Sequence, residues 1–252
     1  MVVITGATDG IGYEAALALA GAKAEVVLTG RNTEKGRAAV EKIHAAYPEA
    51  DVRYATLNLA DLASVNEFAD RLSREHRALD LLINNGGVMT PPTRHVTKDG
   101  FELQFGTNHL GHFALTALLL PLLRSGAHAR VVTVSSAAHR LRAAIHFDDL
   151  QWERRYNPWQ AYAQSKLATL MFAFELQRRS DANGWGVMST ACHPGYAVTG
   201  LQSSGPRLGL SRPSRSELIG KKLFEPWASQ SAAAGALPTL IAATSQIGRA
   251  HV

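Results

Sequence analysis

Short runs of apolar, β-branched residues alternate with longer amphipathic stretches along almost the whole chain, and this alternation constrains the fold most strongly. The runs that favour strands are Val2–Thr5, Val26–Thr29, Val52–Thr56, Leu81–Ile83, Val131–Val134 and Val187–Ala191. The stretches that favour helices are Ile11–Ala22, Glu34–Tyr47, Leu62–His76, Gly100–Leu123, Gln160–Ala182 and Ser229–Ala243. Such alternation builds a parallel sheet with helices on both faces. We therefore predict an α/β fold with a doubly wound parallel sheet in strand order 3-2-1-4-5-6, the seventh strand missing.

No linker divides the chain, because the one segment rich in Pro, Gly and Ser, residues 203–216, follows the sixth predicted strand. We therefore predict a single domain over residues 1–245. Residues 246–252 match neither a strand nor a cap, and we expect a non-native or disordered tail there. The first strand begins directly after Met1, so we expect the natural chain to start further upstream.

Composition and charge exclude several classes of protein. Hydrophobic residues make up 46% of the chain, enough for a full core, but the sequence has no run of ~20 apolar residues that predicts a membrane span. The net charge is +5, yet Lys and Arg are scattered, which argues against nucleic-acid binding. The single cysteine, Cys192, rules out an internal disulfide and favours a reducing compartment, so we expect a cytoplasmic protein.

A glycine-rich turn joins the first predicted strand to the first helix, with the sequence Thr5-Gly6-Ala7-Thr8-Asp9-Gly10-Ile11-Gly12. Glycines there permit a tight turn and let backbone N–H groups approach a pyrophosphate at the helix N-terminus, where the helix dipole favours anions. Spacing G-x-x-x-G-x-G differs from the commoner G-x-G-x-x-G. At the first strand–helix junction, the turn predicts a dinucleotide site.

The end of the second strand indicates which dinucleotide. A carboxylate at this place accepts hydrogen bonds from the adenosine ribose 2′-hydroxyl and repels a 2′-phosphate. This chain has Thr29-Gly30-Arg31-Asn32 instead, and a guanidinium pairs well with phosphate. We therefore predict NADP(H) rather than NAD. Asp9 argues mildly against this if its carboxylate lies near the phosphate; its alternative role is to cap the helix.

Tyr162 and Lys166 form a Y-x-x-x-K pair on one face of the fifth predicted helix. A nearby cation stabilises a phenolate, so we expect Lys166 to lower the pKa of Tyr162 toward neutrality. The pair then predicts a proton donor and acceptor that works near neutral pH.

Five motifs in order carry a resemblance to a known family. They are Thr5–Gly12, then Asn84-Asn85-Gly86-Gly87, then Ser135-Ser136, then Tyr162 with Lys166, then Pro194-Gly195, with Asn108 between the second and third. This series resembles the short-chain dehydrogenase/reductase family over essentially the whole chain, and implies a Rossmann-type fold. Its retinol-dehydrogenase and WW-domain-oxidoreductase-like branch is indicated by Thr107–Phe113, the insertion Ile145–Trp159 and His193-Pro194-Gly195.

The resemblance implies a catalytic tetrad of Asn108, Ser136, Tyr162 and Lys166. Tyr162 exchanges a proton with the substrate oxygen, and Ser136 orients that oxygen. Lys166 binds the nicotinamide ribose, and Asn108 holds a water that continues the proton relay. The implied cofactor contacts, besides Tyr162 and Lys166, are Gly6, Thr8, Asp9, Gly10, Ile11, Gly12, Arg31, Asn58, Leu59, Asn85, Gly86, Gly87, Pro194, Gly195, Val198 and Thr199.

Two positions depart from the family pattern. Asn58 stands where the family usually has an Asp that binds the adenine amino group, so charge assistance is lost there. Gly86 replaces the usual Ala of N-N-A-G. Histidines such as His109 and His112 lack ligand spacing with carboxylate support, so we predict no metal.

The predicted function is the NADP(H)-dependent transfer of hydride between a carbonyl and an alcohol, on a small substrate of apolar character. Met89, Trp159, Tyr196 and Leu201 are candidate pocket residues. Two alternatives stay open: a C=C reductase of the protochlorophyllide-reductase type, and a non-catalytic NADP-binding regulatory module. By resemblance we also expect a homo-oligomer that pairs through the long helices.

Overall fold

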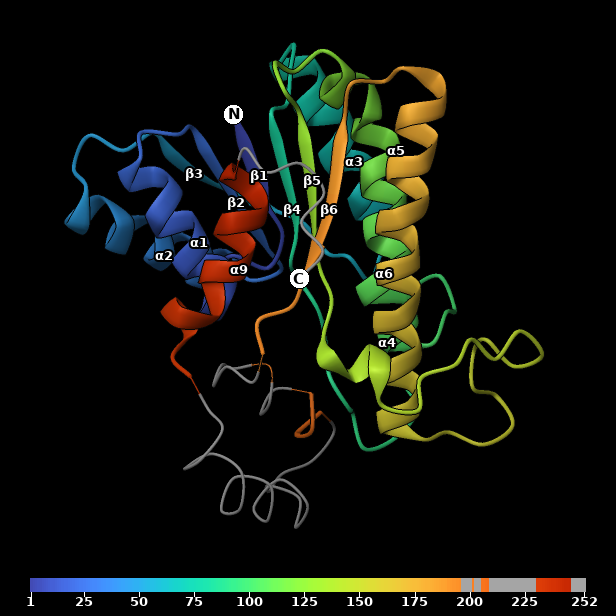
Figure 1. The fold of residues 1–252 in the computed structure, drawn as a ribbon. Coiled ribbons are helices and arrows are strands. Elements are labelled where there is room, and N and C mark those ends of the chain that lie inside the picture. Colours follow the sequence, from blue (N-terminus) through green and yellow to red (C-terminus); the bar gives the residue numbers. More distant parts are fainter. Residues whose placement is uncertain (196–200, 202–204, 209–229, 246–252) are drawn as a thin grey trace.

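The computed structural model describes residues 1–195, 201, 205–208 and 230–245. Within these residues the strands form one parallel six-stranded sheet in the order β3-β2-β1-β4-β5-β6, as predicted (Figure 1). The strands are β1 (Val2–Ile4), β2 (Val26–Gly30), β3 (Val52–Thr56), β4 (Leu81–Asn84), β5 (Arg130–Val134) and β6 (Met188–Cys192). The order reverses direction between β1 and β4, which is where open α/β sheets bind their ligands.

Helices cover both faces of the sheet, and Figure 1 shows α1, α2 and α9 on one side of it and α3, α5 and α6 on the other. The helices are α1 (Gly10–Gly21), α2 (Thr33–Ala46), α3 (Leu62–Glu75), α4 (Leu103–Phe105), α5 (Gly111–Arg124), α6 (Pro158–Asn183) and α9 (Ala232–Thr244). Two shorter turns are η1 (Gly106–Leu110), which is π-helical, and η2 (Ala137–Arg140), which is 3₁₀-helical.

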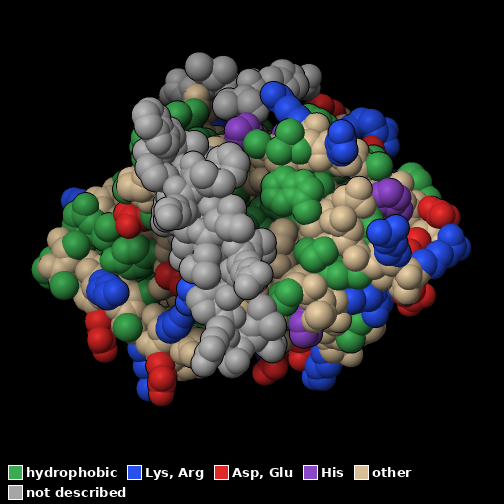
Figure 2. All heavy atoms as spheres, turned by 90° about the horizontal axis from the view of Figure 1, so that it is seen from below, with side chains coloured by type: hydrophobic (Ala, Val, Ile, Leu, Met, Phe, Trp, Pro, Cys, Tyr) green, Lys and Arg blue, Asp and Glu red, His purple; other side chains and the backbone are tan. Residues whose placement is uncertain are grey.

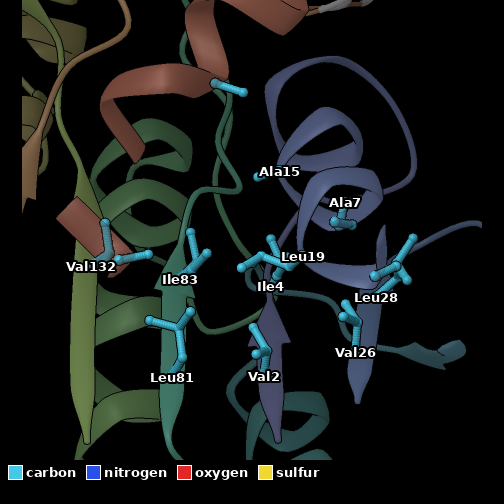
Figure 3. Packing of buried hydrophobic residues seen from close by; sticks show 14 of the residues in the cluster. Val2, Ile4, Ala7, Ala15, Leu19, Val26, Leu28, Leu81, Ile83 and Val132 are labelled. Carbon is cyan, nitrogen blue, oxygen red and sulfur yellow. The ribbon is translucent and has the colours of Figure 1, made fainter. Parts of the chain in front are cut away.

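Alternate residues of each strand enter two separate cores, because successive side chains of a strand point to opposite faces. Val2 and Ile4 of β1 pack with Leu19 of α1 (Figure 3), whereas Val3 between them packs in the second core, which also holds Phe68 of α3 and Leu119 of α5. The central strands β1 and β4 are therefore buried along their whole length, as expected inside a parallel sheet, whereas the edge strand β3 carries Arg53 and the exposed Thr56.

The predicted helix Gly100–Leu123 was wrong in its first part. Regular structure begins only at Leu103, where the buried Glu102 carboxylate accepts hydrogen bonds from the backbone N–H groups of Gln104 and Phe105. The backbone then widens into the π-helical turn η1 before α5 starts at Gly111. Asn108 therefore lies in a π-helical turn and not in a continuous α-helix, a geometry frequent at functional sites.

Several predictions fall partly or wholly beyond the described residues. Tyr196, Val198 and Thr199 lie there, as does the tail 246–252. The last predicted helix is present as α9, which starts at Ala232 with the Ser231 hydroxyl accepting from the Ala234 N–H. Among the described residues, no helix is long and apolar enough to cross a membrane.

Candidate functional site

The turn between β1 and α1 is built for close approach to an anion. Gly6 and Gly10 have φ of 62° and 57°, a left-handed backbone that other L-residues adopt at a cost. Helix α1 begins at Gly10, so its unpaired N–H groups open onto the turn. Asp9 occupies the N-cap position but its side chain accepts no hydrogen bond from the helix, which leaves the capping role unsupported.

A cleft of about 720 Å³ runs from this turn along the carboxyl ends of the strands. Its volume and mixed polar lining suit a dinucleotide. Twelve of the predicted cofactor residues line it: Gly6, Thr8, Asp9, Gly10, Ile11, Gly12, Arg31, Asn58, Leu59, Asn85, Gly86 and Gly87. Leu201, predicted for the substrate pocket, lines this cleft too.

At one end of the cleft, Arg31 is joined by a second cation that the sequence analysis missed. Lys35 lines the same cleft four residues later, in the first turn of α2. The N-cap Asn32 accepts a hydrogen bond from the Lys35 backbone N–H, which orders this helix start. The signal in the sequence was the i, i+4 spacing of the two basic residues across a predicted helix start. Two cations and a helix N-terminus together suit a phosphate group.

Asn58 has less hydrogen-bonding capacity free for a ligand than the sequence predicts. Its side-chain oxygen, the atom proposed as the adenine acceptor, already accepts a hydrogen bond from the backbone N–H of Ala60 at 3.2 Å. Its backbone N–H donates to the Ser64 hydroxyl. The residue lines the cleft, but one lone pair of its oxygen is used within the protein.

The loop after β4 fastens the glycine-rich turn to the rest of the cleft. The Asn85 amide donates to the carbonyl oxygens of Thr5 at 2.8 Å and Gly6 at 3.1 Å. A Cβ on Gly6 would lie 2.6 Å from the Gly86 Cα, so this close approach of the two backbones requires glycine at position 6. Gly87 lies at the end of the cleft near the predicted tetrad. A Cβ added to Gly87 would lie 3.0 Å from the Asn108 Oδ1 and 4.0 Å from the Lys166 Nζ.

Three of the four tetrad residues meet where β5 and α6 come together. Tyr162 and Lys166 lie one turn apart on α6 and both are buried. Ser136 follows β5, and its hydroxyl lies close enough to the Tyr162 hydroxyl to lower the pKa of the phenol. Its neighbour Ser135 is turned away and donates to the Lys166 carbonyl at 2.8 Å. The structure thus brings Ser136, rather than Ser135, to the phenol.

The expected lowering of the Tyr162 pKa was wrong for the protein by itself. Burial raises the pKa of Tyr162 to about 12, and the Ser136 hydrogen bond offsets only part of that rise. Lys166 does not compensate, because its Nζ donates to the Val134 carbonyl at 3.0 Å and lies 5.9 Å from the centre of the Tyr162 ring. Burial also lowers the pKa of Lys166 to about 8. Tyr162 is therefore protonated at neutral pH, ready to donate.

Asn108 is held by protein groups on both sides of its amide. Its Oδ1 accepts from the Val88 N–H at 2.8 Å, and its Nδ2 donates to the Val88 carbonyl at 3.0 Å and the Ser165 hydroxyl at 2.9 Å. The side chain thereby ties the loop after β4 to the catalytic helix α6. Its expected role in holding a relay water stays a prediction.

A buried polar cluster next to the tetrad supports the insertion before α6. The Gln104 amide accepts from the Thr90 N–H and donates to the Tyr156 hydroxyl and the Pro158 carbonyl. Burial raises the pKa values of Glu102 and Tyr156, which keeps the phenol neutral. These bonds hold the start of α6, and with it Tyr162, against the loop after β4.

The substrate side of Tyr162 is apolar. Met89 packs against the small cluster of Tyr162, Ala138 and Ala163, and the Trp159 ring lies 6.1 Å from the Tyr162 ring with 44% of its surface exposed. Figure 2 views this end of the molecule from below and shows hydrophobic side chains at its left and to the right of centre, with most of the charged side chains toward the rim. The remaining predicted contacts, Pro194 and Gly195, follow β6, and the Pro194 carbonyl accepts from the Gln230 amide.

Two further candidates from the sequence were a metal site and the single cysteine. Within the described ranges, no three His, Cys, Asp or Glu residues are placed to hold a metal ion. Cys192 is buried beside the Thr239 hydroxyl, and burial raises the pKa of its thiol to about 11, which keeps it unreactive.

A family model described as short chain dehydrogenase matches residues 1–206, the part of the chain that holds every tetrad residue. The chain belongs to the short-chain dehydrogenase family. It is 47% identical over 201 residues to Retinol dehydrogenase 13 of Homo sapiens, a match that covers 79% of this chain and 60% of that protein. It is 38% identical over 247 residues to Polyprenol dehydrogenase of Danio rerio, covering 96% of this chain and 73% of that protein. The predicted family and its retinol-dehydrogenase branch are confirmed.

The chain thus spans about 60% of the length of the first of these relatives. Among solved structures, a protein from Mycobacterium paratuberculosis superposes with a TM-score of 0.76 at 42% identity, covering 98% of this chain and 77% of that one. A short chain dehydrogenase from Burkholderia cenocepacia J2315, solved in complex with NADP, superposes with a TM-score of 0.72 at 20% identity, covering 98% and 92%. The second likeness supports the short-chain dehydrogenase fold alone.

The buried histidines predict a loss of stability in acid. Burial lowers the pKa of His112, and separately that of His109, to about 4 from an ordinary 6.5. The unfolded chain therefore binds protons first, so this stabilisation is present above pH 6.5 and is lost as the pH falls toward 4. For His112 the loss is on the order of 3 kcal/mol. Urea unfolding at a series of pH values measures it.

The variant His112→Asn removes one such group, and we expect the pH slope of its unfolding free energy to fall by about one proton. The matched control is His128→Asn, the same change at an exposed turn whose φ of 63° Asn tolerates. An unaltered slope in His112→Asn contradicts the assignment.

Proposed function

We propose that this short-chain dehydrogenase is an NADP(H)-dependent oxidoreductase that transfers hydride between the nicotinamide and a carbonyl or alcohol, with Tyr162 as the general acid and base. The observation that carries the proposal is a buried, protonated phenol beside Ser136, one helical turn from Lys166, whose ammonium lies near Gly87 in the lining of the cleft. A cytoplasmic location stays a prediction that rests on the single buried cysteine.

The residues present fit the dinucleotide. The Gly6–Gly12 turn and the N-terminus of α1 suit the pyrophosphate, because the helix begins at Gly10 in the lining of the cleft and its first backbone N–H groups have no partner within the helix. Arg31 and Lys35 suit the 2′-phosphate, and Lys166 suits the hydroxyls of the nicotinamide ribose. When bound, the cofactor supplies or accepts the hydride.

Tyr162 supplies the proton. In the reductive direction the carbonyl carbon gains a hydride, and its oxygen takes the proton of the Tyr162 hydroxyl as negative charge develops. Ser136 donates a hydrogen bond to the same oxygen and keeps it at the phenol. A pKa of about 12 makes Tyr162 a stable proton donor before reaction, and a cation at Lys166 stabilises the phenolate that is left. In the oxidative direction each step reverses.

The substrate proposed is an apolar primary alcohol or its aldehyde, of the kind named in retinol and polyprenol dehydrogenases. Met89 and Trp159 support this, because both present apolar surface beside Tyr162. Turnover of retinal with NADPH, followed by the loss of NADPH absorbance, tests the proposal against a short polar aldehyde as comparison.

Tyr162→Phe should reduce turnover at least a thousandfold, roughly the contribution of the general acid together with its orientation, while NADPH binding changes little. The measurement pairs NADPH oxidation with fluorescence titration of the bound cofactor. Tyr47→Phe is the matched control on an exposed ring. Turnover that survives in Tyr162→Phe excludes this mechanism. A wild-type protein that binds NADPH but reduces no carbonyl favours one of the two alternatives, which a conjugated C=C substrate then separates.

Arg31→Ala should weaken NADPH about tenfold to a hundredfold and NADH far less, because only NADPH carries the 2′-phosphate. Lys35→Ala should act in the same direction, and the double variant should bind both cofactors similarly. Arg37→Ala, on the exposed side of α2 and outside the cleft, serves as control. Dissociation constants come from fluorescence titration. An equal loss for NADPH and NADH contradicts the phosphate assignment.

We also propose a homodimer that pairs through the exposed apolar face of α5 and α6. Phe113 on α5 is 52% exposed and Phe174 on α6 is 56% exposed. The Phe113 ring packs against the Phe172 ring of α6, with 5.5 Å between the ring centres. Such a patch on two adjacent helices marks an interaction surface. Light scattering at micromolar concentration should give twice the chain mass, and Phe174→Glu should give a monomer. Phe147→Glu, at a 79% exposed position in the insertion, is the control. A monomeric wild type contradicts the proposal.

A further inference from the structure

His112 is a buried polar residue on α5 that the proposed reaction does not use. Only 3% of its surface is exposed, and each ring nitrogen has one partner. Nδ1 lies 2.9 Å from the Asn108 carbonyl oxygen, and Nε2 lies 2.8 Å from the Thr5 hydroxyl. One partner belongs to the π-helical turn of the tetrad, and the other begins the glycine-rich turn.

The partners determine where the ring carries its proton. A carbonyl oxygen only accepts, so Nδ1 must donate to Asn108, and the Nε2 of a neutral ring must accept. The Thr5 hydroxyl oxygen already accepts from the backbone N–H groups of Asn85 at 2.8 Å and Gly86 at 2.9 Å. Both of its lone pairs are used, so it can only donate, and its two possible acceptors are Nε2 at 2.8 Å and the Ile83 carbonyl at 3.3 Å. The shorter contact assigns the proton to Nε2, because the lone pair of Nε2 would otherwise face a hydroxyl oxygen with no proton between them. A second ring proton at Nε2 would face a hydroxyl with no lone pair left.

The bonds continue from Asn108 to the catalytic helix. The Asn108 Nδ2 donates to the Ser165 hydroxyl at 2.9 Å, and that hydroxyl donates to the Tyr162 backbone carbonyl at 2.7 Å. A continuous path of buried hydrogen bonds therefore runs from the loop after β4, through Thr5, His112 and Asn108, to Tyr162. Buried networks of this kind favour one geometry, because each broken link removes a hydrogen bond from a buried polar group, although the Asn108 carbonyl also accepts from the Thr169 hydroxyl at 3.2 Å.

We propose that His112 is a positioning residue: as a neutral ring protonated on Nδ1, it holds the tetrad turn in register with the cofactor-binding turn. The inference rests on the proposed function, since the register matters for bringing the phenol to the reacting oxygen. His112 touches neither cofactor nor substrate. Its two ends act on different steps, because the Thr5 end supports the cofactor turn and the Asn108 end supports the catalytic helix.

Two variants of His112 test its hydrogen bonds to Asn108 and to Thr5 separately. The side-chain amide nitrogen of Asn reaches the position of the histidine Nδ1. His112→Asn therefore keeps the hydrogen bond to the Asn108 carbonyl and loses the hydrogen bond to the Thr5 hydroxyl. The longer amide of Gln reaches the place of Nε2, so His112→Gln keeps Thr5 and loses Asn108. We expect His112→Asn to raise the NADPH dissociation constant about tenfold, more than it lowers kcat, and His112→Gln to lower kcat about tenfold, more than it raises that constant.

The controls are His128→Asn and His128→Gln, which make the same changes at an exposed turn. Equal losses of binding and turnover in both His112 variants, no loss in either, or the opposite split each overturn the proposal. Equal losses mean that His112 only stabilises the fold.

A measurement on the wild-type protein needs no variant. Nitrogen-15 NMR of the histidine rings, with the His112 ring assigned through its own Cβ, should show the proton on Nδ1. A proton on Nε2 overturns the proposal. If the wild type oxidises no NADPH, the proposed function fails by itself, and the NMR result together with weaker NADPH binding in His112→Asn than in His112→Gln still decides the role of His112.

Discussion

The Thr5 hydroxyl is the contact on which the arrangement of this short-chain dehydrogenase depends. Thr5 directly follows β1. Its hydroxyl oxygen accepts hydrogen bonds from two backbone N–H groups of the loop after β4 and lies 2.8 Å from the His112 Nε2 of α5. β1 and β4 are the neighbouring strands at which the strand order reverses, so their loops diverge and leave a cleft between them. One side chain thus joins the two loops across the opening where the cofactor is proposed to bind.

Burial decides the electrostatics of the site. Tyr162 and Lys166 both lie in an environment that disfavours charge, so the phenol keeps its proton and the ammonium gives up its proton more easily than in water. A tetrad of this kind is prepared to donate rather than already ionised. In the proposed mechanism, the charge that would stabilise a phenolate comes from Lys166 together with the cofactor in the cleft, so the proton transfer would be coupled to cofactor binding.

The backbone that carries Asn108 departs from regular α-helix at the end of the cleft that holds the predicted tetrad. The π-helical turn η1 presents Asn108 to the loop after β4 with its side chain and to His112 with its carbonyl. Glu102 and Gln104 anchor the segment before it and connect it to the insertion. Loops and helix starts at this edge are therefore held by buried polar groups, whereas the sheet beneath is held by two apolar cores.

The sequence by itself determined the fold class, the strand order and the identity of the glycine-rich turn, the tetrad motifs and Arg31, because strand periodicity and motif spacing are local properties that need no knowledge of packing. Only the tertiary structure decided that Lys35 joins Arg31, that η1 interrupts the predicted helix, that the Tyr162 pKa rises and that His112 contacts Thr5, which lies 107 positions earlier in the chain. Those features arise from burial and from contacts between distant segments, and the spacing of residues along a chain carries no measure of either.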